Sequence, residues 1–360
     1  MTGTKLPVAE QSEKLQISPE YVRISMAAAL VLGLKTGRFF RDGATRCVNL
    51  LQNYPEGCWA NCTYCGLARE RPGEAEDNTF IRVDWPLYST EEVAQSIAAR
   101  EEAVGRVCIA QVHDKRANED LVTMTEVVRR HSKVPISALV SANLLDQDWL
   151  TRIKNAGVDV IGIGLDAASE DVFYETRGRG TKGPHTWEYH WDIVNKAREM
   201  YGPHKVNCHV VVGLGETDEE LVNLFQSLRE IEVEAYLFSF NPEPGTAMEQ
   251  VERAPIHRWR RVQLVKSLLD SQIIQPSAIS FDSSGNIENL AMPKPVLEDV
   301  VRSGTPFMTD GCPDEEGELA CNRPYGSYRP GEEFRDYPFL PILDDTVKIR
   351  HELRLDELVR

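Results

Sequence analysis

The chain has 360 residues, 42% hydrophobic and 27% charged, which is enough for one large barrel with extensions or for two smaller domains. Its net charge of −16 argues against binding nucleic acid or an anionic membrane surface through bulk charge. The N-terminus shows no hydrophobic signal segment, and the longest apolar stretch, Ala27–Leu34, is far shorter than the roughly 20 residues of a membrane span. We therefore expect a cytoplasmic protein that binds neither nucleic acid nor a membrane.

Short β-branched runs alternate with amphipathic helical stretches along most of the chain. A helix is predicted at Pro19–Leu34, and six strand–helix pairs follow it. They are Cys47–Tyr54 with Thr90–Arg100, Val107–Val112 with Asn118–His131, Pro135–Val140 with Asp146–Ala156, Val158–Leu165 with Thr186–Met200, Lys205–Val212 with Thr217–Ile231, and Glu234–Phe240 with Ile256–Ser271. Ser89 and Thr217 are predicted N-caps. Such alternation produces right-handed βαβ units, so we expect an α/β fold with a partial or full TIM-type (β/α) barrel.

The pattern divides the chain into three predicted regions. Residues 1–45 form an N-terminal helical extension, residues 46–275 form the barrel, and residues 276–360 form an irregular C-terminal extension. The last region is rich in glycine, proline and acidic residues and carries Cys312 and Cys321. In barrels of this kind the loops after the strand C-termini carry the active site, and the extension is expected to cover one barrel end.

Three cysteines lie within eight residues directly after the first predicted strand. Cys58, Cys62 and Cys65 have the spacing CxxxCxxC, with an aromatic residue, Tyr64, before the last of them. Three thiolates on one loop can bind three irons of a [4Fe–4S] cube and leave the fourth iron open to a small-molecule ligand. The alternative is a zinc site, which needs a fourth ligand that Cys47 or a distant histidine could supply.

This loop resembles the cluster loop of the radical S-adenosylmethionine (SAM) superfamily. In that family a reduced [4Fe–4S] cluster cleaves SAM to methionine and a 5′-deoxyadenosyl radical, which removes hydrogen from an unactivated C–H bond. The resemblance implies that Cys58, Cys62 and Cys65 hold the cluster and that Tyr64 lies against the adenine. It also implies SAM as a cofactor, while the radical chemistry belongs to the cofactors rather than to a catalytic side chain.

The segment Val210–Thr217 resembles the family's glycine motif after the fifth strand. That resemblance assigns Gly213, Gly215 and Glu216 to the surroundings of the adenine. The alternative is that this segment is only a turn between a strand and a helix.

Two charged residues resemble positions in biotin synthase. Asp166, at the end of the fourth predicted strand, is similar to an aspartate that contacts the cofactor ribose or the substrate. Its alternative is an N-cap of a helix that begins near Ser169. Arg177 is similar to an arginine that reaches the methionine carboxylate, and its alternative is a solvated surface arginine.

Five further cysteines are Cys47, Cys108, Cys208, Cys312 and Cys321. Cys312 and Cys321 lie in a segment rich in glycine and proline. There a second, auxiliary [4Fe–4S] cluster is favoured over a disulfide or a zinc site. Cys47 is either a further ligand of that cluster or a plain core residue. Cys108 falls where the first ligand of the in-barrel biotin synthase cluster belongs. However, the third strand has no cysteine and Cys208 is one residue out of register, which argues against a true biotin synthase. Cys108 and Cys208 are therefore predicted to be small buried hydrophobes.

Nearly the whole chain resembles the biotin-synthase-like, two-protein lipoyl synthase of archaea and some bacteria. The matching segments are Cys47–Tyr54 with Glu56–Gly66, Phe80–Pro86, Gly183–His185, Phe238–Gly245, and the tail segments Gly311–Pro313 and Cys321–Tyr325. The resemblance implies sulfur insertion into an octanoyl chain on a lipoyl carrier protein, together with a companion synthase component and a ferredoxin or flavodoxin as electron donor. The tail cysteines are separated by the eight residues Pro313–Ala320, a wider spacing than we expect.

Two alternatives stay open. One is another biotin-synthase-like enzyme, a biotin synthase or a small-molecule C–H functionalising enzyme without sulfur donation. The other is a non-catalytic iron–sulfur or zinc protein. The basic run His257–Arg261 could dock an acidic carrier domain, although a solvated helix face is the simpler interpretation.

Overall fold

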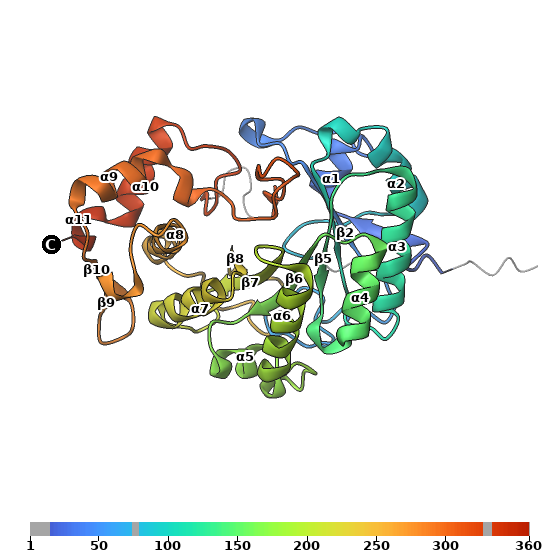
Figure 1. The fold of residues 1–360 in the computed structure, drawn as a ribbon, viewed down its shortest axis with the longest axis horizontal. Coiled ribbons are helices and arrows are strands. Elements are labelled where there is room, and N and C mark those ends of the chain that lie inside the picture. Colours follow the sequence, from blue (N-terminus) through green and yellow to red (C-terminus); the bar gives the residue numbers. More distant parts are fainter. Residues whose placement is uncertain (1–14, 74–78, 327–332, 360) are drawn as a thin grey trace, which may run out of the picture.

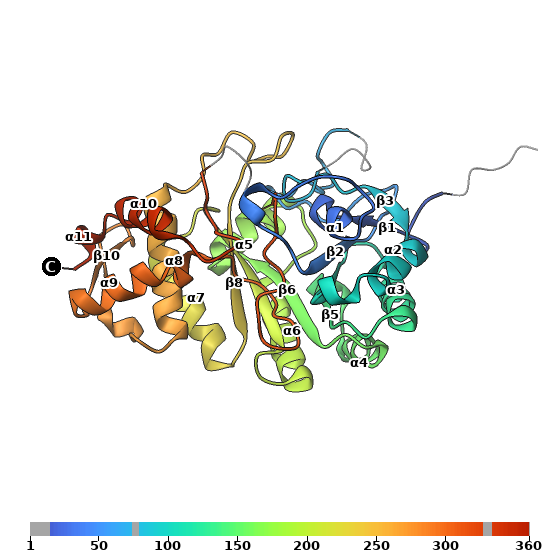
Figure 2. The same cartoon turned by 90° about the horizontal axis from the view of Figure 1, so that it is seen from above.

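The structure, a computed structural model, describes residues 15–73, 79–326 and 333–359. Its centre is an eight-stranded sheet in the order β3-β1-β2-β4-β5-β6-β7-β8 (Figures 1 and 2). Six of these strands pair in parallel: β2 (Cys47–Leu51), β4 (Arg106–Ala110), β5 (Ile136–Val140), β6 (Val160–Asp166), β7 (Val206–Val212) and β8 (Glu234–Ser239). Among the described strands, β8 and β3 pair on one side only, so the sheet is an open, partial barrel.

Helices follow the parallel strands and pack on the outer face of the sheet (Figure 1). They are α2 (Thr90–Ala98), α3 (Ala117–His131), α4 (Gln147–Ala156), α5 (Glu170–Thr176), α6 (Trp187–Tyr201), α7 (Asp218–Glu230) and α8 (Ile256–Asp270). The two predicted N-caps are confirmed: Ser89 Oγ accepts the N–H of Glu92, and Thr217 forms a capping box with Glu220. The expected α/β barrel fold is therefore confirmed.

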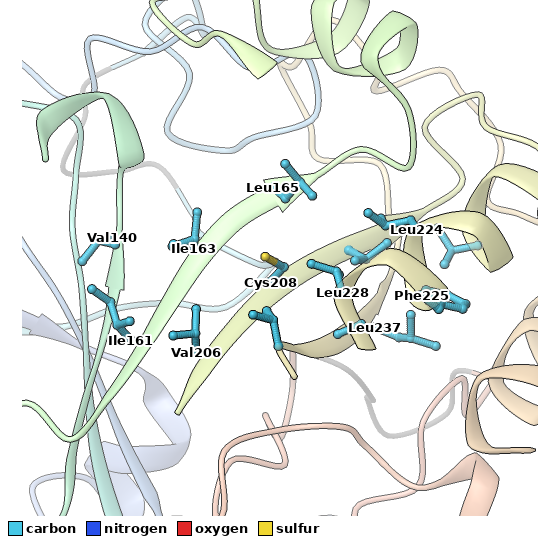
Figure 3. Close-up of a cluster of buried hydrophobic side chains, with 14 of the residues drawn as sticks. Val140, Ile161, Ile163, Leu165, Val206, Cys208, Leu224, Phe225, Leu228 and Leu237 are labelled. Carbon is cyan, nitrogen blue, oxygen red and sulfur yellow. The ribbon is translucent and has the colours of Figure 1, made fainter. Parts of the chain in front are cut away.

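The hydrophobic core lies between the sheet and its helices. Alternate residues of each strand point outward, as Figure 3 shows for Ile161, Ile163 and Leu165 on β6. Cys208 of β7 has the same orientation and is 0% exposed, in the cluster that also contains Leu228 of α7. The prediction that Cys208 is a small buried hydrophobe is thus confirmed, and the intervening residues of β7 are left to face the barrel interior.

The predicted N-terminal helix is wrong. Its first part forms strand β1 (Tyr21–Ile24), which pairs antiparallel with β2 and with β3 (Leu87–Ser89), and only Met26–Val31 forms a helix, α1. The physical reason is the edge of β2, whose backbone groups need a partner that β1 supplies. Ser25 ends the strand, and its hydroxyl accepts the N–H of Ala28 as the cap of α1.

The C-terminal region has more regular structure than the sequence predicts. It contains the hairpin β9 (Ile279–Phe281) and β10 (Ile287–Leu290), then α9 (Lys294–Ser303), α10 (Leu343–Leu353) and the short α11 (Leu355–Leu358). The solvated-face interpretation of His257–Arg261 is wrong for Trp259 and Arg260, because this part of α8 packs against these elements, whereas docking of an acidic carrier domain stays a prediction. Trp259 is buried and donates to the carbonyl of Arg335, and buried Arg260 forms an ion pair with Glu352 at 2.8 Å.

The segment of residues 308–326 contains no helix and no strand longer than single bridges. It lies against the N-terminal ends of the barrel strands, where Arg106 donates to Pro313 O at 2.6 Å and Asn322 donates to Ala44 O at 2.6 Å. At the opposite edge, Arg323 donates to Leu237 O at 3.1 Å. This tail segment, drawn orange-red in Figure 2, therefore connects both sides of the open barrel at its base.

No helix in the described ranges has both the length and the apolar character that a membrane span requires.

Candidate active site

The cysteine loop after β2 lies at the C-terminal rim of the barrel. Its backbone is fixed by hydrogen bonds to neighbouring loops: Trp59 N–H donates to His113 O at 2.9 Å, and Thr63 N–H donates to Thr176 O at 2.8 Å. Cys58, Cys62 and Cys65 all line one cavity of about 1150 Å³. This is the rim on which barrel enzymes place their chemistry.

Burial sets the protonation of these three thiols. Burial raises the pKa of Cys58 and Cys65, and it raises the pKa of Cys62 to about 11. In the metal-free protein the three groups are therefore neutral thiols at pH 7. Iron would displace their protons, since metal sites bind cysteine as thiolate.

The zinc alternative does not fit the geometry. A tetrahedral zinc ion with bonds of about 2.3 Å needs its sulfur ligands about 3.8 Å apart. Among the described residues, no three cysteine, histidine or acidic side chains converge on one ion in this way. Three separate thiols around one cavity fit a cluster, in which each thiolate binds a different iron.

Tyr64, Asp166 and Arg177 meet in the same cavity. Tyr64 Oη donates to Asp166 Oδ2 at 2.6 Å, and Arg177 Nη1 lies 2.5 Å from the same oxygen and also donates to Gly164 O. Arg177 is only 5% exposed, so it is not a solvated surface arginine. The N-cap of α5 is Ser169, so Asp166 does not cap this helix.

The backbone at the end of β6 aims Asp166 into the cavity. The pairing between β6 and β7 shifts by one residue between Gly164 and Asp166, and Asp166 has a left-handed φ of 62°. Such a conformation is uncommon for a non-glycine residue and is found where the surrounding structure holds it. Here the two hydrogen bonds from Tyr64 and Arg177 hold it, and the site presents a cation, a carboxylate and an aromatic ring on one wall.

Gly213, Gly215 and Glu216 lie elsewhere. They form the turn between β7 and α7 and do not line the cavity of the cysteine loop in the described structure. Glu216 accepts the N–H groups of Gly213 and Leu214, both at 2.8 Å, and forms an ion pair with Arg258 at 2.9 Å. Gly213 and Gly215 have φ values of 113° and 123°, which require glycine. The turn interpretation describes what these residues do here, and their contact with adenine stays a prediction.

Several residues that line this cavity were not predicted from the sequence. His113 and His185 line it, with His113 Nδ1 2.7 Å from Ser141 Oγ. Burial, and then the charge of Arg177, lower the pKa of both histidines, so both rings are neutral at pH 7. The sequence signal that could have identified His113 is its position, because it directly follows a predicted strand at the rim. Buried Glu243 also lines the cavity and accepts from Thr79 Oγ1 at 2.8 Å.

A second group of thiols lies deeper in the barrel. Cys312 and Cys321 line a separate cavity of about 680 Å³, and Asn49 Nδ2 lies 3.6 Å from Cys321 Sγ and 3.4 Å from Cys47 Sγ. A hydrogen bond with Cys321, then burial, raises the pKa of Cys47, and the charges of Cys321, Cys108 and Cys312 raise it further. The structure thus brings together the three cysteines proposed from the sequence.

Cys108 lines this second cavity as well. Cys108 is partly buried, and β4 turns its side chain into the cavity that Cys312 and Cys321 also line, so the small-hydrophobe interpretation stays a prediction. All eight cysteines are free thiols, which excludes a disulfide between Cys312 and Cys321 in this structure.

The two cavities adjoin along a mostly apolar wall. The residues that line both are Phe80, Ile81, Leu139, His209 and Phe238. Burial, and then Arg323, lower the pKa of His209 to about 3, so this imidazole is neutral. The cysteine loop and the second thiol group are therefore separated by a mostly apolar boundary, with Arg323 stacked 3.9 Å from the centroid of the Phe238 ring.

Comparison with known proteins relates part of the sequence to a family. The Radical SAM superfamily model matches residues 53–228, just under half of the chain. The chain is 25% identical to the biotin synthase of Rickettsia felis over 254 residues, 68% of this chain and 76% of that protein. It is 25% identical to the biotin synthase of Aquifex aeolicus over 215 residues, 59% of this chain and 60% of that protein. It is 30% identical to the biotin synthase of Saccharopolyspora erythraea over 214 residues, 58% of this chain and 56% of that protein.

Solved structures with a similar chain trace are more distant in sequence. Methylornithine synthase aligns at 13% identity with a TM-score of 0.45, covering 62% of this chain and 60% of that one. The FeFe-hydrogenase maturase HydG from Carboxydothermus hydrogenoformans aligns at 13% identity with a TM-score of 0.48, covering 83% of this chain and 68% of that one. The family match itself includes the cysteine loop, Asp166 and Arg177. Residues 53–228 therefore match a Radical SAM superfamily domain, and the chain has biotin synthase relatives at low identity.

Proposed function

We propose that this enzyme inserts sulfur at an unactivated C–H bond of an octanoyl chain carried on a lipoyl carrier protein. The observation that carries the proposal is the apolar wall shared by the two cavities, which lies between the cysteine loop and the second thiol group. A saturated hydrocarbon chain has no polar group to recognise, so a site for it must be apolar. Phe80, Leu139 and Phe238 supply such a surface.

Cys58, Cys62 and Cys65 would hold a [4Fe–4S] cluster, and Tyr64, Asp166 and Arg177 would orient SAM beside it. When bound, the reduced cluster and SAM supply the carbon radical that removes a hydrogen atom from the substrate. The buried guanidinium of Arg177 suits a carboxylate, and the Asp166 carboxylate suits a hydroxyl donor. The apolar wall excludes water, which protects a reactive carbon centre from side reactions.

The sulfur atom would come from an auxiliary cluster held by the second thiol group. Cys47, Cys312 and Cys321 are on the far side of the shared wall, so a chain lying against that wall would reach both groups. The resemblance to two-protein lipoyl synthases supports the substrate, the companion component and a ferredoxin or flavodoxin as reductant.

Biotin synthesis is the second candidate, favoured by the names of the relatives. Against it stands the outward orientation of Cys208, which removes one cysteine from the barrel interior. A radical SAM reaction on another small molecule, without sulfur donation, is tested by the same experiment.

The experiment is mass spectrometry of an octanoylated carrier domain after incubation with anaerobically reconstituted enzyme, SAM and dithionite, with and without the companion component. We expect a mass gain of at least one sulfur atom, and none with the Cys58→Ala enzyme. SAM cleavage without sulfur gain in either case contradicts the proposal and favours a small-molecule substrate. Sulfur gain on a biotin precursor instead would favour the second candidate.

A further inference from the structure

A two-residue turn supplies the part of the shared apolar wall that the sheet does not build. Of the five residues that line both cavities, three lie on β5, β7 and β8, whereas Phe80 and Ile81 come from a segment that follows the cysteine loop. The backbones of Phe80 and Val83 pair through N–H···O hydrogen bonds of 3.4 and 3.2 Å. Ile81 and Arg82 are therefore the two central residues of the turn.

The backbone conformation of this turn is unfavourable for the residues that adopt it. Ile81 and Arg82 have left-handed φ values of 53° and 56°. A turn with positive φ at both central residues is normally built from Asn-Gly, Asp-Gly or Gly-Gly. A β-branched residue at positive φ is an outlier, because its side chain crowds the backbone there. Such strain is kept only where the surrounding structure holds it, and it is concentrated at functional sites.

Two neighbouring loops hold the turn in place. Buried Glu243, on the loop after β8, accepts a hydrogen bond from Thr79 Oγ1 at 2.8 Å and another from the N–H of Arg82. Arg71 Nη1 donates to Gly66 O of the cysteine loop at 2.6 Å and to Thr79 O at 3.2 Å. The turn is therefore tied both to the cysteine loop and to the loop after β8, which fixes the position of Ile81.

The side chain of Ile81 lies where the two cavities meet. It lines both of them, and a Cβ atom at Gly326 of the tail segment would lie 3.1 Å from Ile81 Cγ2. Ile81 is only partly buried, which leaves part of its apolar surface facing the cavities. Its side chain thus occupies the space between the turn, the tail segment and the strands, and a smaller side chain there would widen the junction.

We propose that Ile81 is a specificity-determining residue, whose side chain closes the junction between the two cavities and so sets which carbon of a bound alkyl chain is attacked. The substrate in this statement rests on the proposed function. The methylene groups of a hydrocarbon chain are alike and have no polar atom to recognise, and a single methylene group adds little binding energy. The position of such a chain is therefore best set by a steric stop, which limits how deeply the chain enters.

Three variants separate the side chain of Ile81 from the strain of its backbone. Ile81→Gly and Ile81→Ala both remove the branched side chain, but only glycine adopts the left-handed conformation without strain. Both proteins should fold, and the Tm of Ile81→Gly should exceed that of Ile81→Ala. The matched control is Gln272→Gly, because Gln272 also has a left-handed φ, 57°, but is exposed and lines neither cavity.

The first readout needs neither cofactor nor substrate. The metal-free full chain is treated anaerobically with N-ethylmaleimide, and peptide mass spectrometry follows the initial labelling rates of Cys321 in the second cavity and Cys58 in the cavity of the cysteine loop. We expect Cys321 to react at least fivefold faster in both Ile81 variants than in the wild-type and Gln272→Gly proteins, while the rate at Cys58 stays within twofold. An unchanged rate at Cys321 in the Ile81 variants would overturn the proposal.

The second readout identifies the carbon that is attacked. Octanoylated carrier domains deuterated at one carbon at a time are incubated with reconstituted enzyme, the companion component, SAM and dithionite. Hydrogen abstraction breaks one C–D bond of the chain and forms one C–D bond in 5′-deoxyadenosine. We expect both Ile81 variants to take deuterium from at least one carbon that the wild-type and Gln272→Gly enzymes leave intact.

Identical positions of deuterium transfer in the Ile81 variants and the wild-type enzyme would also overturn the proposal. A wild-type enzyme that takes deuterium from no carbon of the chain would contradict the octanoyl substrate instead. In that case the labelling rate of Cys321 still decides whether Ile81 closes the junction, so failure of this proposal and failure of the proposed function are distinguishable.

Discussion

Asp166→Asn separates the stability of the rim from its role in cofactor binding. The substitution keeps the size of the side chain but removes the charge that faces Arg177 at 2.5 Å. Removing one partner of a buried ion pair costs about 3–5 kcal/mol. Arg177 keeps its hydrogen bond to Gly164 O, so we expect the lower end, about 3 kcal/mol. For a chain of this length that corresponds to a fall in Tm of roughly 4 °C.

The same variant should bind SAM more weakly. Loss of one hydrogen bond to a charged group is worth about 1.5–3 kcal/mol, which is roughly a 10- to 150-fold increase in Kd. Equilibrium dialysis with reconstituted protein measures this, and differential scanning calorimetry measures the stability.

The matched control is Asp159→Asn at the other end of β6. Asp159 pairs at 2.7 Å with Arg106, whose side chain is also buried. This control should lose comparable stability but bind SAM with unchanged Kd. Equal SAM affinity in the two variants would refute the assignment of Asp166 to the cofactor site.

Three further substitutions test other parts of the account. Leu139→Trp places a larger side chain at the wall between the two cavities. The ratio of sulfurated product to 5′-deoxyadenosine should therefore fall at least tenfold, while the rate of SAM cleavage stays within a few-fold of the wild-type rate. An unchanged ratio contradicts a substrate path along this wall. Glu216→Gln leaves the glycine turn without a carboxylate opposite Arg258. Urea unfolding should show that the free energy of unfolding falls by about 1–3 kcal/mol. An unchanged free energy of unfolding would mean that the turn does not depend on this charge. Burial raises the pKa of Asp336 to about 7. The folded state therefore keeps a proton that the unfolded state releases near pH 4. The free energy of unfolding of the wild-type protein should fall by up to about 4 kcal/mol between pH 4 and pH 7. Asp336→Asn should lack this slope, and parallel pH profiles of the two proteins would show that Asp336 is not its source.

The strand–helix order could be predicted because its signals are local. Hydrophobic periodicity and the caps Ser89 and Thr217 place the six units within about two residues at most ends. Strand β1 could not be found in this way, because four residues carry little periodic signal and its stability comes from pairing with β2. The C-terminal helices were missed for a similar reason, since their burial depends on α8.

In the candidate site, too, features that depend on local sequence could be predicted and features that depend on long-range contacts could not. The spacing of Cys58, Cys62 and Cys65 is a property of one loop, and it was readable from the sequence. The position of Cys208 relative to the glycine turn was also enough to predict that its side chain points away from the barrel interior, because alternate residues of a strand face opposite sides. The position of Cys108 beside Cys312 and Cys321 depends on a tail that returns from more than 200 residues away, and no local pattern predicts such a contact.

The most direct test of the central claim is formation of 5′-deoxyadenosine from SAM by the anaerobically reconstituted, dithionite-reduced protein, measured by liquid chromatography with mass spectrometry. The account predicts that the wild-type and Cys208→Ala proteins form it, and that replacing Cys58, Cys62 or Cys65 with alanine lowers the rate by at least 100-fold, which corresponds to about 2.7 kcal/mol. Formation at the wild-type rate in any of those three variants would contradict the claim that these thiols hold the cluster that cleaves SAM.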